Sequence, residues 1–232
     1  MARYTVAYSS FISNLTEVDT LIRLASAKER KNAVALRREI SSLCRGAVVL
    51  LSSHLEAYIK ELGEVALDSL YAKNVQRNKL SSRFFFYISK NIIDDLQDTA
   101  DPEKIAEHLF AFIDQDSKYW SKTGTFPDPI SAEQFNKGFS NPALTKICAY
   151  INRFGYAEYK RDLGREMKAA FTPVTNMVEQ LVKTRNKIAH GDPLATMPPA
   201  DIRLMVDSIR TFAATTDSLF ASWWKSNFCS IR

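Results

Sequence analysis

The sequence predicts an all-α protein, a bundle of long amphipathic helices joined by short loops. Apolar residues recur at three- and four-residue steps along most of the chain, which is the period of a helix with one buried face. The 232 residues include only 7 glycines and 8 prolines, most of them between the periodic segments. Because 46% of the residues are hydrophobic, 14 of them phenylalanine, the chain can bury a substantial core.

Two helices are expected at the start of the chain. One apolar stripe runs from about Tyr8 to Ala27, and a charged joint at residues 28–31 follows it. The second stripe, from about Asn32 to Tyr71, is the longest in the chain and contains no proline. Its interior glycines, Gly46 and Gly63, each cost about 1 kcal/mol relative to alanine, which indicates close helix crossings.

Two ionisable residues of this long helix are candidates for a role in chemistry. His54 lies on or beside the apolar stripe, where a lone histidine is more often a packed residue with a satisfied partner than a catalyst. Glu56 lies off the stripe, and a solvated position is the simpler interpretation.

Residues 75–155 have a looser pattern, and we interpret them as a helical insertion rather than an independent domain. Residues 83–88, rich in phenylalanine, suit either a strand or a buried turn of helix, and the polar residues after them favour helix. Asp101 is a good N-cap and Pro102 fits the first helical position, so a helix is expected from there to about Tyr119.

The second half of the insertion carries three further signals. Residues 123–129 contain glycine and two prolines and predict a loop. Ser131 and Gln134 fit a capping box for a short helix. Another helix is expected to begin at Asn141–Pro142 and to end at Gly155.

The segment from Thr172 to Pro193 predicts a helix with a marked start and end. Thr172 is a suitable N-cap, and Pro173 follows at a position where a missing N–H costs nothing. Gly191 then favours the C-terminal end. The apolar stripe consists of Val174, Met177, Val178, Leu181 and Ile188.

The neighbouring segments complete the core. Mixed charges in residues 156–168 predict a solvated helix face. A last helix is expected from Pro198–Pro199 to about Phe228, and its Trp223–Trp224 pair suits a core or a subunit contact better than base stacking. We therefore expect one domain over residues 1–232, with core helices at about 8–71 and 157–228.

One residue breaks the apolar stripe of the Thr172–Pro193 helix. Arg185 stands four residues after Leu181, where packing alone favours leucine, so it needs a partner or a water-filled cleft. His190 lies in the last turn, and five residues of regular helix separate the two directions by about 140°. One copy of the helix therefore does not bring both side chains to one atom, whereas two facing copies could. The alternative is structural: Arg185 pairs with a core glutamate and His190 merely caps the helix.

The segment from Arg185 to Gly191 resembles the Arg-x4-6-His motif of the HEPN superfamily, all-helical domains of which many are metal-independent ribonucleases. Asn186 matches the polar residue that commonly follows the arginine in that family. The stretch Leu50–Tyr58 resembles the early long helix of HEPN proteins from bacterial defence and toxin–antitoxin loci. Asn141–Pro142 is a weaker match to one branch of the family.

The resemblance implies an endoribonuclease in which the RNA 2′-hydroxyl attacks the adjacent phosphate without a metal or other cofactor. Arginine presents a planar fork to phosphate oxygens, which suits Arg185 to hold the scissile phosphate. A helix C-terminus favours a cation, which suits His190 to general-acid work, and Asn186 would orient the phosphate or the His190 ring. The family also implies a homodimer with a composite site, and a carboxylate such as Glu56 can face the motif.

The resemblance further implies a toxin or an abortive-infection effector in antiphage defence, with an antitoxin or defence-system protein as a possible partner. The alternative is a non-catalytic HEPN module that binds RNA or a nucleotide, or serves only in protein interaction. In some HEPN toxins a tyrosine two residues after the histidine is modified, but Asp192 stands here, so that control is not expected.

Composition narrows the other classes of function. The three cysteines and three histidines form no metal-binding pattern. No secretory signal or membrane-length apolar run is found, so a cytoplasmic protein is expected. A net charge of +5 permits an anionic partner, but the basic residues are dispersed and locate no nucleic-acid groove.

Overall fold

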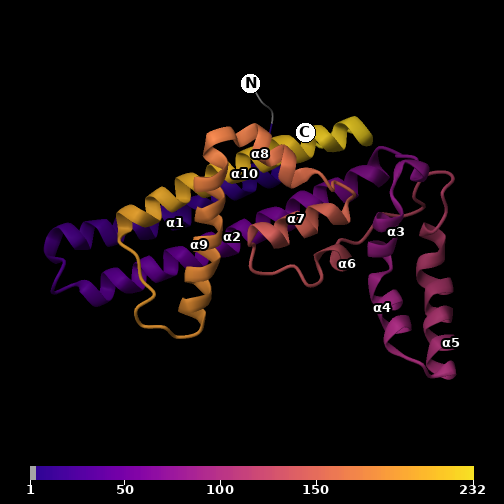
Figure 1. Cartoon of the computed structure of the whole chain (residues 1–232), viewed down its shortest axis with the longest axis horizontal. Helices are drawn as coiled ribbons and strands as arrows, with labels where there is room; N and C mark the ends of the chain where they lie inside the picture. The colour runs from indigo at the N-terminus through magenta and orange to yellow at the C-terminus, as the bar shows by residue number, and fades with distance from the viewer. Residues whose placement is uncertain (1–3) are drawn as a thin grey trace.

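The computed structural model describes residues 4–232, and within that range it is all-α with no strand (Figure 1). The helices are α1 (Val6–Asn32), α2 (Arg37–Ala72), α3 (Ser82–Ile88), α4 (Lys90–Asp98), α5 (Pro102–Ala111), α6 (Glu133–Asn136), α7 (Leu144–Arg153), α8 (Tyr159–Met167), α9 (Phe171–Ala189) and α10 (Pro199–Asn227). The predicted fold class, with a long early helix and helices inserted before α9, is confirmed. The division into one domain with an insertion stays a prediction.

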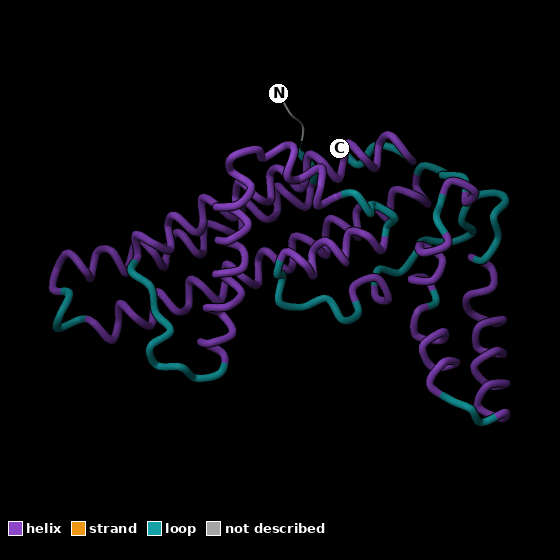
Figure 2. The backbone as a smooth tube through the Cα atoms, in the orientation of Figure 1, coloured by secondary structure: helices purple, strands orange, loops and turns teal. Residues whose placement is uncertain are grey.

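The two longest early helices, α1 and α2, form an antiparallel hairpin, and α10 runs along it (Figures 1 and 2). The charged joint predicted at residues 28–31 is wrong, because lysine, glutamate and arginine are good helix formers and α1 continues to Asn32. The chain turns instead at residues 33–36, where the Asn32 side chain accepts a hydrogen bond from the Ala35 N–H at 3.0 Å. The second helix therefore begins at Arg37 rather than near Asn32.

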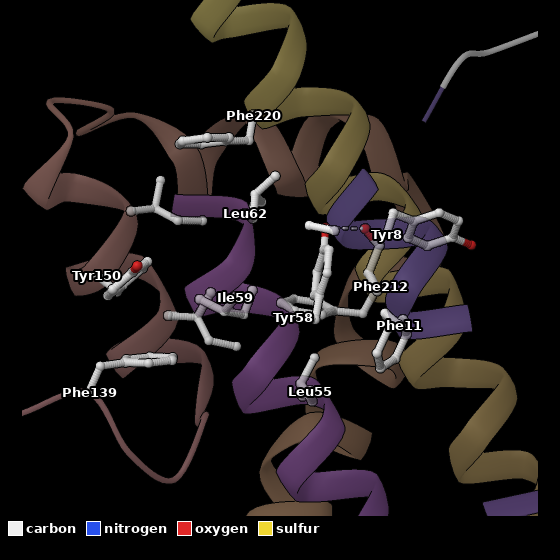
Figure 3. Close-up of a cluster of buried hydrophobic side chains, with 14 of the residues drawn as sticks. Tyr8, Phe11, Leu55, Tyr58, Ile59, Leu62, Phe139, Tyr150, Phe212 and Phe220 are labelled. Carbon is white, nitrogen blue, oxygen red and sulfur yellow. Dashed lines mark hydrogen bonds between the residues drawn. The ribbon is translucent and has the colours of Figure 1, made fainter. Parts of the chain in front are cut away.

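Buried aromatic and aliphatic side chains of α2 fill the space between α1, α7 and α10 (Figure 3). Polar ties within this core fix α10. The Tyr58 hydroxyl donates to the Ala213 carbonyl at 3.0 Å, and buried Asp217 accepts from the N–H of Thr5 at 3.1 Å and from its hydroxyl. The predicted core role is confirmed for Trp224, which is fully buried and donates to the Ser69 hydroxyl at 3.0 Å, while Trp223 is partly buried and packs against the core.

Helix α7 fastens the inserted region to the core helices. It crosses α2 at Gly63, where a Cβ would overlap the Tyr150 hydroxyl and lie 2.8 Å from Phe154 Cζ, so the close approach predicted there is found. The one predicted at Gly46 is wrong, because the nearest atom to a Cβ there is Leu21 Cδ1 at 3.5 Å, an ordinary contact. Two carboxylates secure the start of α7: Glu56 of α2 accepts from the Asn141 N–H at 3.0 Å, and Glu179 of α9 accepts from the Leu144 N–H at 2.9 Å.

The rest of the inserted region follows the predictions in part. Residues 83–88 lie in helix α3, and Asp101 caps α5 through the Glu103 N–H at 3.0 Å, as expected. Regular helix α5 ends at Ala111, and a π turn and a 3₁₀ turn complete the path to Tyr119. Together α3, α4 and α5 project from the body at the end of the molecule away from the α1–α2 turn (Figure 1).

Two predicted helix starts in the inserted region are displaced. The capping box is wrong: Ser131 accepts from the Glu133 N–H at 3.2 Å, Ala132 occupies the cap, and the Gln134 side-chain oxygen is buried without a partner. Helix α7 begins at Leu144, later than Asn141–Pro142, because Asn141 adopts a left-handed conformation (φ 54°).

Helix α9 contacts both α2 and α10, so it is placed by the two longest helices of the core. It begins at Phe171, not after a Thr172 cap, because a 3₁₀ turn at residues 168–170 leads directly into it. Pro173 still costs no helical hydrogen bond, because the first four N–H groups of a helix have no acceptor within the helix.

Candidate active site at the end of α9

The C-terminus of α9 is closed by a Schellman motif that presents His190 at the surface. Gly191 has φ 78°, a conformation that glycine adopts without strain. The Gly191 N–H donates to Ile188 O at 3.1 Å, and the Asp192 N–H donates to Lys187 O at 3.0 Å. The end predicted at Gly191 is therefore confirmed, and His190 is the C-cap residue with an exposed side chain.

Arg185 lies one turn before this end and is half-buried. Its guanidinium donates to the Asn186 side-chain oxygen at 3.2 Å. Within residues 4–232 it pairs with no carboxylate, so the core glutamate of the structural alternative is not found. The guanidinium keeps most of its five N–H donors available for an anion.

A hydrogen bond between side chains links two of the three predicted site residues within one copy of the chain. Arg185 and Asn186 are hydrogen-bonded, whereas the His190 side chain forms no hydrogen bond within the described part of the chain. Its backbone N–H caps the helix by donating to Asn186 O at 2.9 Å, which leaves the imidazole free.

The loop that follows His190 is held against the first turns of α2. Arg45 of α2 donates to the Asp192 carbonyl at 2.6 Å, and Ser41 lies 3.3 Å from the Thr196 hydroxyl. The Asp192 side chain is occupied locally, since its Oδ1 accepts from the Leu194 N–H at 2.9 Å. These contacts place the end of the motif helix next to α2.

An open groove of about 680 Å³ lies between the start of α2 and this loop. Arg37, Arg38 and Arg45 line it on the α2 side, and no carboxylate does. The remaining lining residues are Val34, Ala35, Ser41, Ser42, Gly191 and Pro193. Three arginines of the start of α2 thus gather at one groove, although the basic residues look dispersed in the sequence.

One feature of the sequence could have indicated this groove, namely the regular spacing of polar residues at the start of α2. Arg37, Ser41 and Arg45 recur every four residues and so share one helix face. Nothing in the sequence indicated that the loop after His190 lies across that face.

The two other ionisable candidates on α2 are engaged elsewhere. His54 Nε2 lies 3.2 Å from Glu17 of α1, the satisfied partner expected of a packed histidine. Glu56 is not simply solvated, because it bonds both the Asn141 N–H and Lys60 at 2.7 Å. Neither side chain forms a hydrogen bond with a motif residue.

Metal-binding and membrane-spanning features are not found in residues 4–232. No group of three or more histidine, cysteine, aspartate or glutamate side chains is arranged to hold a metal ion there. None of the helices in that range is both long and apolar enough to cross a bilayer. A separate hollow of about 290 Å³ lies within the inserted region, between α3, α4 and α6, and includes none of the motif residues.

The family model described as RiboL-PSP-HEPN matches residues 9–222, a span that includes most of the α1–α2 hairpin, the inserted region and α9. No curated protein and no solved structure matches the chain.

Proposed function

The chain belongs to the RiboL-PSP-HEPN family, and from this premise we propose that it is a metal-independent endoribonuclease acting through Arg185, Asn186 and His190. Membership in the family suggests either a ribonuclease or an RNA-binding module. The proposal of cleavage rests on one observation above all: a half-buried guanidinium without a carboxylate partner in residues 4–232 lies one turn from an unengaged imidazole.

The proposed reaction is internal transesterification of RNA. A base removes the proton of the 2′-hydroxyl, and the 2′-oxygen forms a bond to the adjacent phosphorus. The bond from phosphorus to the 5′-oxygen breaks, and an acid gives that oxygen a proton. The products are a 2′,3′-cyclic phosphate and a free 5′-hydroxyl, so no water and no cofactor enters this step.

The motif residues match the three requirements of this reaction. The Arg185 fork binds the nonbridging phosphate oxygens and stabilises the charge that grows on them. Asn186, already bonded to Arg185, fixes the guanidinium plane and leaves its amide N–H groups for phosphate. His190, exposed at the helix end, transfers the proton.

The proposed catalytic unit is a homodimer. One imidazole cannot act as acid and base in the same step, and on a regular helix the five-residue spacing points His190 and Arg185 about 140° apart. An isologous contact near the C-terminus of α9 would bring a second His190 to the same phosphate, because a twofold axis places each surface against itself.

The proposed biological role is that of a toxin or an antiphage effector that arrests growth by cutting RNA, held in check by an antitoxin or defence-system protein. Induced expression in a bacterial host tests it. Arg185→Ala and His190→Ala should abolish growth arrest, and equal arrest by the wild type and both variants would defeat this role.

Cleavage of labelled RNA by purified protein tests the catalytic proposal. Arg185→Ala and His190→Ala should each lose at least about 100-fold in rate, the usual contribution of a proton-transfer or charge-stabilising group. Lys187→Ala is the matched control, because Lys187 is an exposed cation on the same helix turn. Unchanged cleavage in both motif variants would refute the assignment, and RNA that is bound but left intact by the wild type would select the non-catalytic module.

A further inference from the structure

We propose that the groove lined by Arg37, Arg38 and Arg45 binds the sugar–phosphate backbone of the single-stranded RNA that flanks the bond presented to His190. The inference rests on the proposed function and names the substrate-binding surface of the same site. Its first basis is position. Gly191, the residue after His190, lines the groove, although His190 itself does not, so a strand lying in the groove reaches the C-terminal end of α9 next to the motif.

The second basis is the chemistry of the lining. Three guanidinium groups and the hydroxyls of Ser41 and Ser42 face the groove, and no carboxylate lines it. Arginine binds phosphate through paired N–H groups. The Ser41 and Ser42 hydroxyls already donate to the Thr196 hydroxyl at 3.3 Å and to the Arg38 carbonyl at 2.9 Å, so the guanidinium groups supply the free donors. Of the nearby acids, Glu39 is already paired with Lys28, and Glu29 lines an adjoining hollow on the other side of Arg37 rather than the groove.

Two of these arginines are available to bind an anionic ligand. Arg37 and Arg38 are exposed and form no ion pair within residues 4–232. Arg45 differs, because it already holds the Asp192 carbonyl and so contributes to the shape of the groove as well as to its charge. Arg37 and Arg38 are therefore the residues whose removal tests binding without disturbing the loop.

The backbone at the start of α2 adds to the positive electrostatic potential of the groove. Leu36 is the N-cap residue and provides no side-chain hydrogen bond to the first turn. The N–H groups of Leu36 and Arg37 already donate to Asn32 O at 3.1 Å and to Val34 O at 3.4 Å, which leaves those of Arg38 and Glu39 in the first turn. A helix N-terminus favours an anion. Helix dipole and guanidinium groups act together on a phosphate placed there.

The dimensions fit a strand rather than a single phosphate. Arg37 and Arg45 are eight residues apart, about 12 Å along a helix. A stacked strand advances about 3.4 Å per nucleotide, so the arginines span roughly three nucleotides. An open groove of about 680 Å³ leaves both ends free for a longer chain.

A second copy of the protein is the competing occupant, since Val34 is 88% exposed at the rim of the groove and Leu194 is 83% exposed in the loop after His190. A twofold contact through the groove itself would place the arginines of both copies together without compensating charge, which is unfavourable. The groove is therefore expected to remain open in the dimer and to face the RNA.

The test measures binding apart from cleavage. The probe is a fluorescein-labelled RNA of about 12 nucleotides, within the usual site size of single-strand binders, with every 2′-oxygen methylated so that it cannot be cut by 2′-attack. Anisotropy titrations across a range of salt compare the wild type with Arg37→Ala/Arg38→Ala. The control, Lys73→Ala/Lys79→Ala, removes the same two charges from exposed positions beyond the other end of α2.

The arginine pair should weaken binding about tenfold at physiological salt and lower the salt slope by about 1.4, or 0.7 for each phosphate that no longer meets an arginine. The lysine pair should change binding less than about twofold. With cleavable RNA, the arginine pair should raise KM and leave kcat near the wild-type value.

Equal binding by the wild type and the arginine pair would overturn the inference, as would an equal loss of affinity in the lysine pair. A change in oligomeric state of the arginine pair, measured by sedimentation, would assign the groove to a subunit contact and also overturn it. Failure of the proposed function looks different: wild-type protein that binds the probe through these arginines but cuts no RNA would leave the groove assignment standing.

Discussion

Replacing Gly63 by alanine tests how α7 and the inserted region are attached to the core. The substitution adds one methyl group to the face of α2 that α7 crosses. That methyl would overlap the Tyr150 hydroxyl and lie 2.8 Å from Phe154 Cζ, closer than real Cβ contacts approach. Both neighbours are almost completely buried, with 1% of each residue exposed, so neither can rotate into solvent.

The expected loss of stability follows from three contributions. Inserting a methyl into a packed core costs about 1–3 kcal/mol. Displacing Tyr150 also breaks its 2.6 Å hydrogen bond to Asn136, worth about 1 kcal/mol. Alanine regains about 1 kcal/mol of helix propensity, so Gly63→Ala should lower the free energy of unfolding by about 1–3 kcal/mol.

Gly46→Ala is the matched control in the same helix. The nearest atom to its added methyl is Leu21 Cδ1 at 3.5 Å, an ordinary contact. It should therefore raise stability by up to about 1 kcal/mol. Thermal unfolding followed by helical circular dichroism measures both, and for a chain of this size each kcal/mol moves Tm by about 2–4 °C. A Gly63→Ala protein that melts at or above the temperature of Gly46→Ala would refute the crossing described for α2 and α7.

Three further predictions follow from buried groups and from the dimer. Burial, with a smaller contribution from Glu29, raises the pKa of the Cys44 thiol to about 11. Iodoacetamide at pH 8 should therefore label this thiol only after unfolding, and mass spectrometry that shows rapid labelling of the native protein would contradict this. Burial raises the pKa of Asp217 above its usual value of 3.8 although Thr5 donates two hydrogen bonds to it, so the native state holds that proton more tightly than the unfolded chain. The stability that this group contributes then falls as pH rises from about 3.8 through the raised native pKa. In urea unfolding measured from about pH 3.5 to 7, Asp217→Asn should lack this decline. A stability difference between the wild type and Asp217→Asn that stays constant over this range would refute the prediction. Because the proposed site needs two copies, cleavage per subunit should rise with protein concentration over the range where sedimentation shows dimer formation, and constant activity down to the monomer would exclude a composite site.

The sequence predicted the large features of the fold because these depend on local periodicity. The stripes of α1, α2 and α10 and the end of α9 at Gly191 required only the helix period and end signals. Gly63 was informative because glycine inside a helix is unfavourable unless another element approaches closely.

The features that the sequence placed wrongly or missed depend on contacts and conformations that local sequence patterns do not encode. Helix α9 begins earlier than Thr172 because Lys168 adopts φ 51° and starts a 3₁₀ turn. The arginine groove depends on Arg45 meeting the Asp192 carbonyl 147 residues away. The charged residues at 28–31 interrupted the apolar stripe without ending the helix, because hydrophobic pattern and helix propensity are separate properties.

Part of the candidate site could likewise be predicted from the sequence, and part depends on the fold. Arg185 was recognisable because an arginine replaced an apolar residue in the stripe, and His190 because of its spacing from Arg185. The absence of a carboxylate partner for Arg185 within residues 4–232 emerged only from the fold, and it is the feature that favours a phosphate ligand over a buried ion pair.

The chemistry of the cut ends tests the central claim most directly. Wild-type protein incubated with RNA in excess EDTA should leave 2′,3′-cyclic phosphate and 5′-hydroxyl ends, and His190→Ala with unchanged Tm should leave none. Cleavage that stops in EDTA, or that yields 5′-phosphate ends, would contradict metal-independent attack by the 2′-hydroxyl.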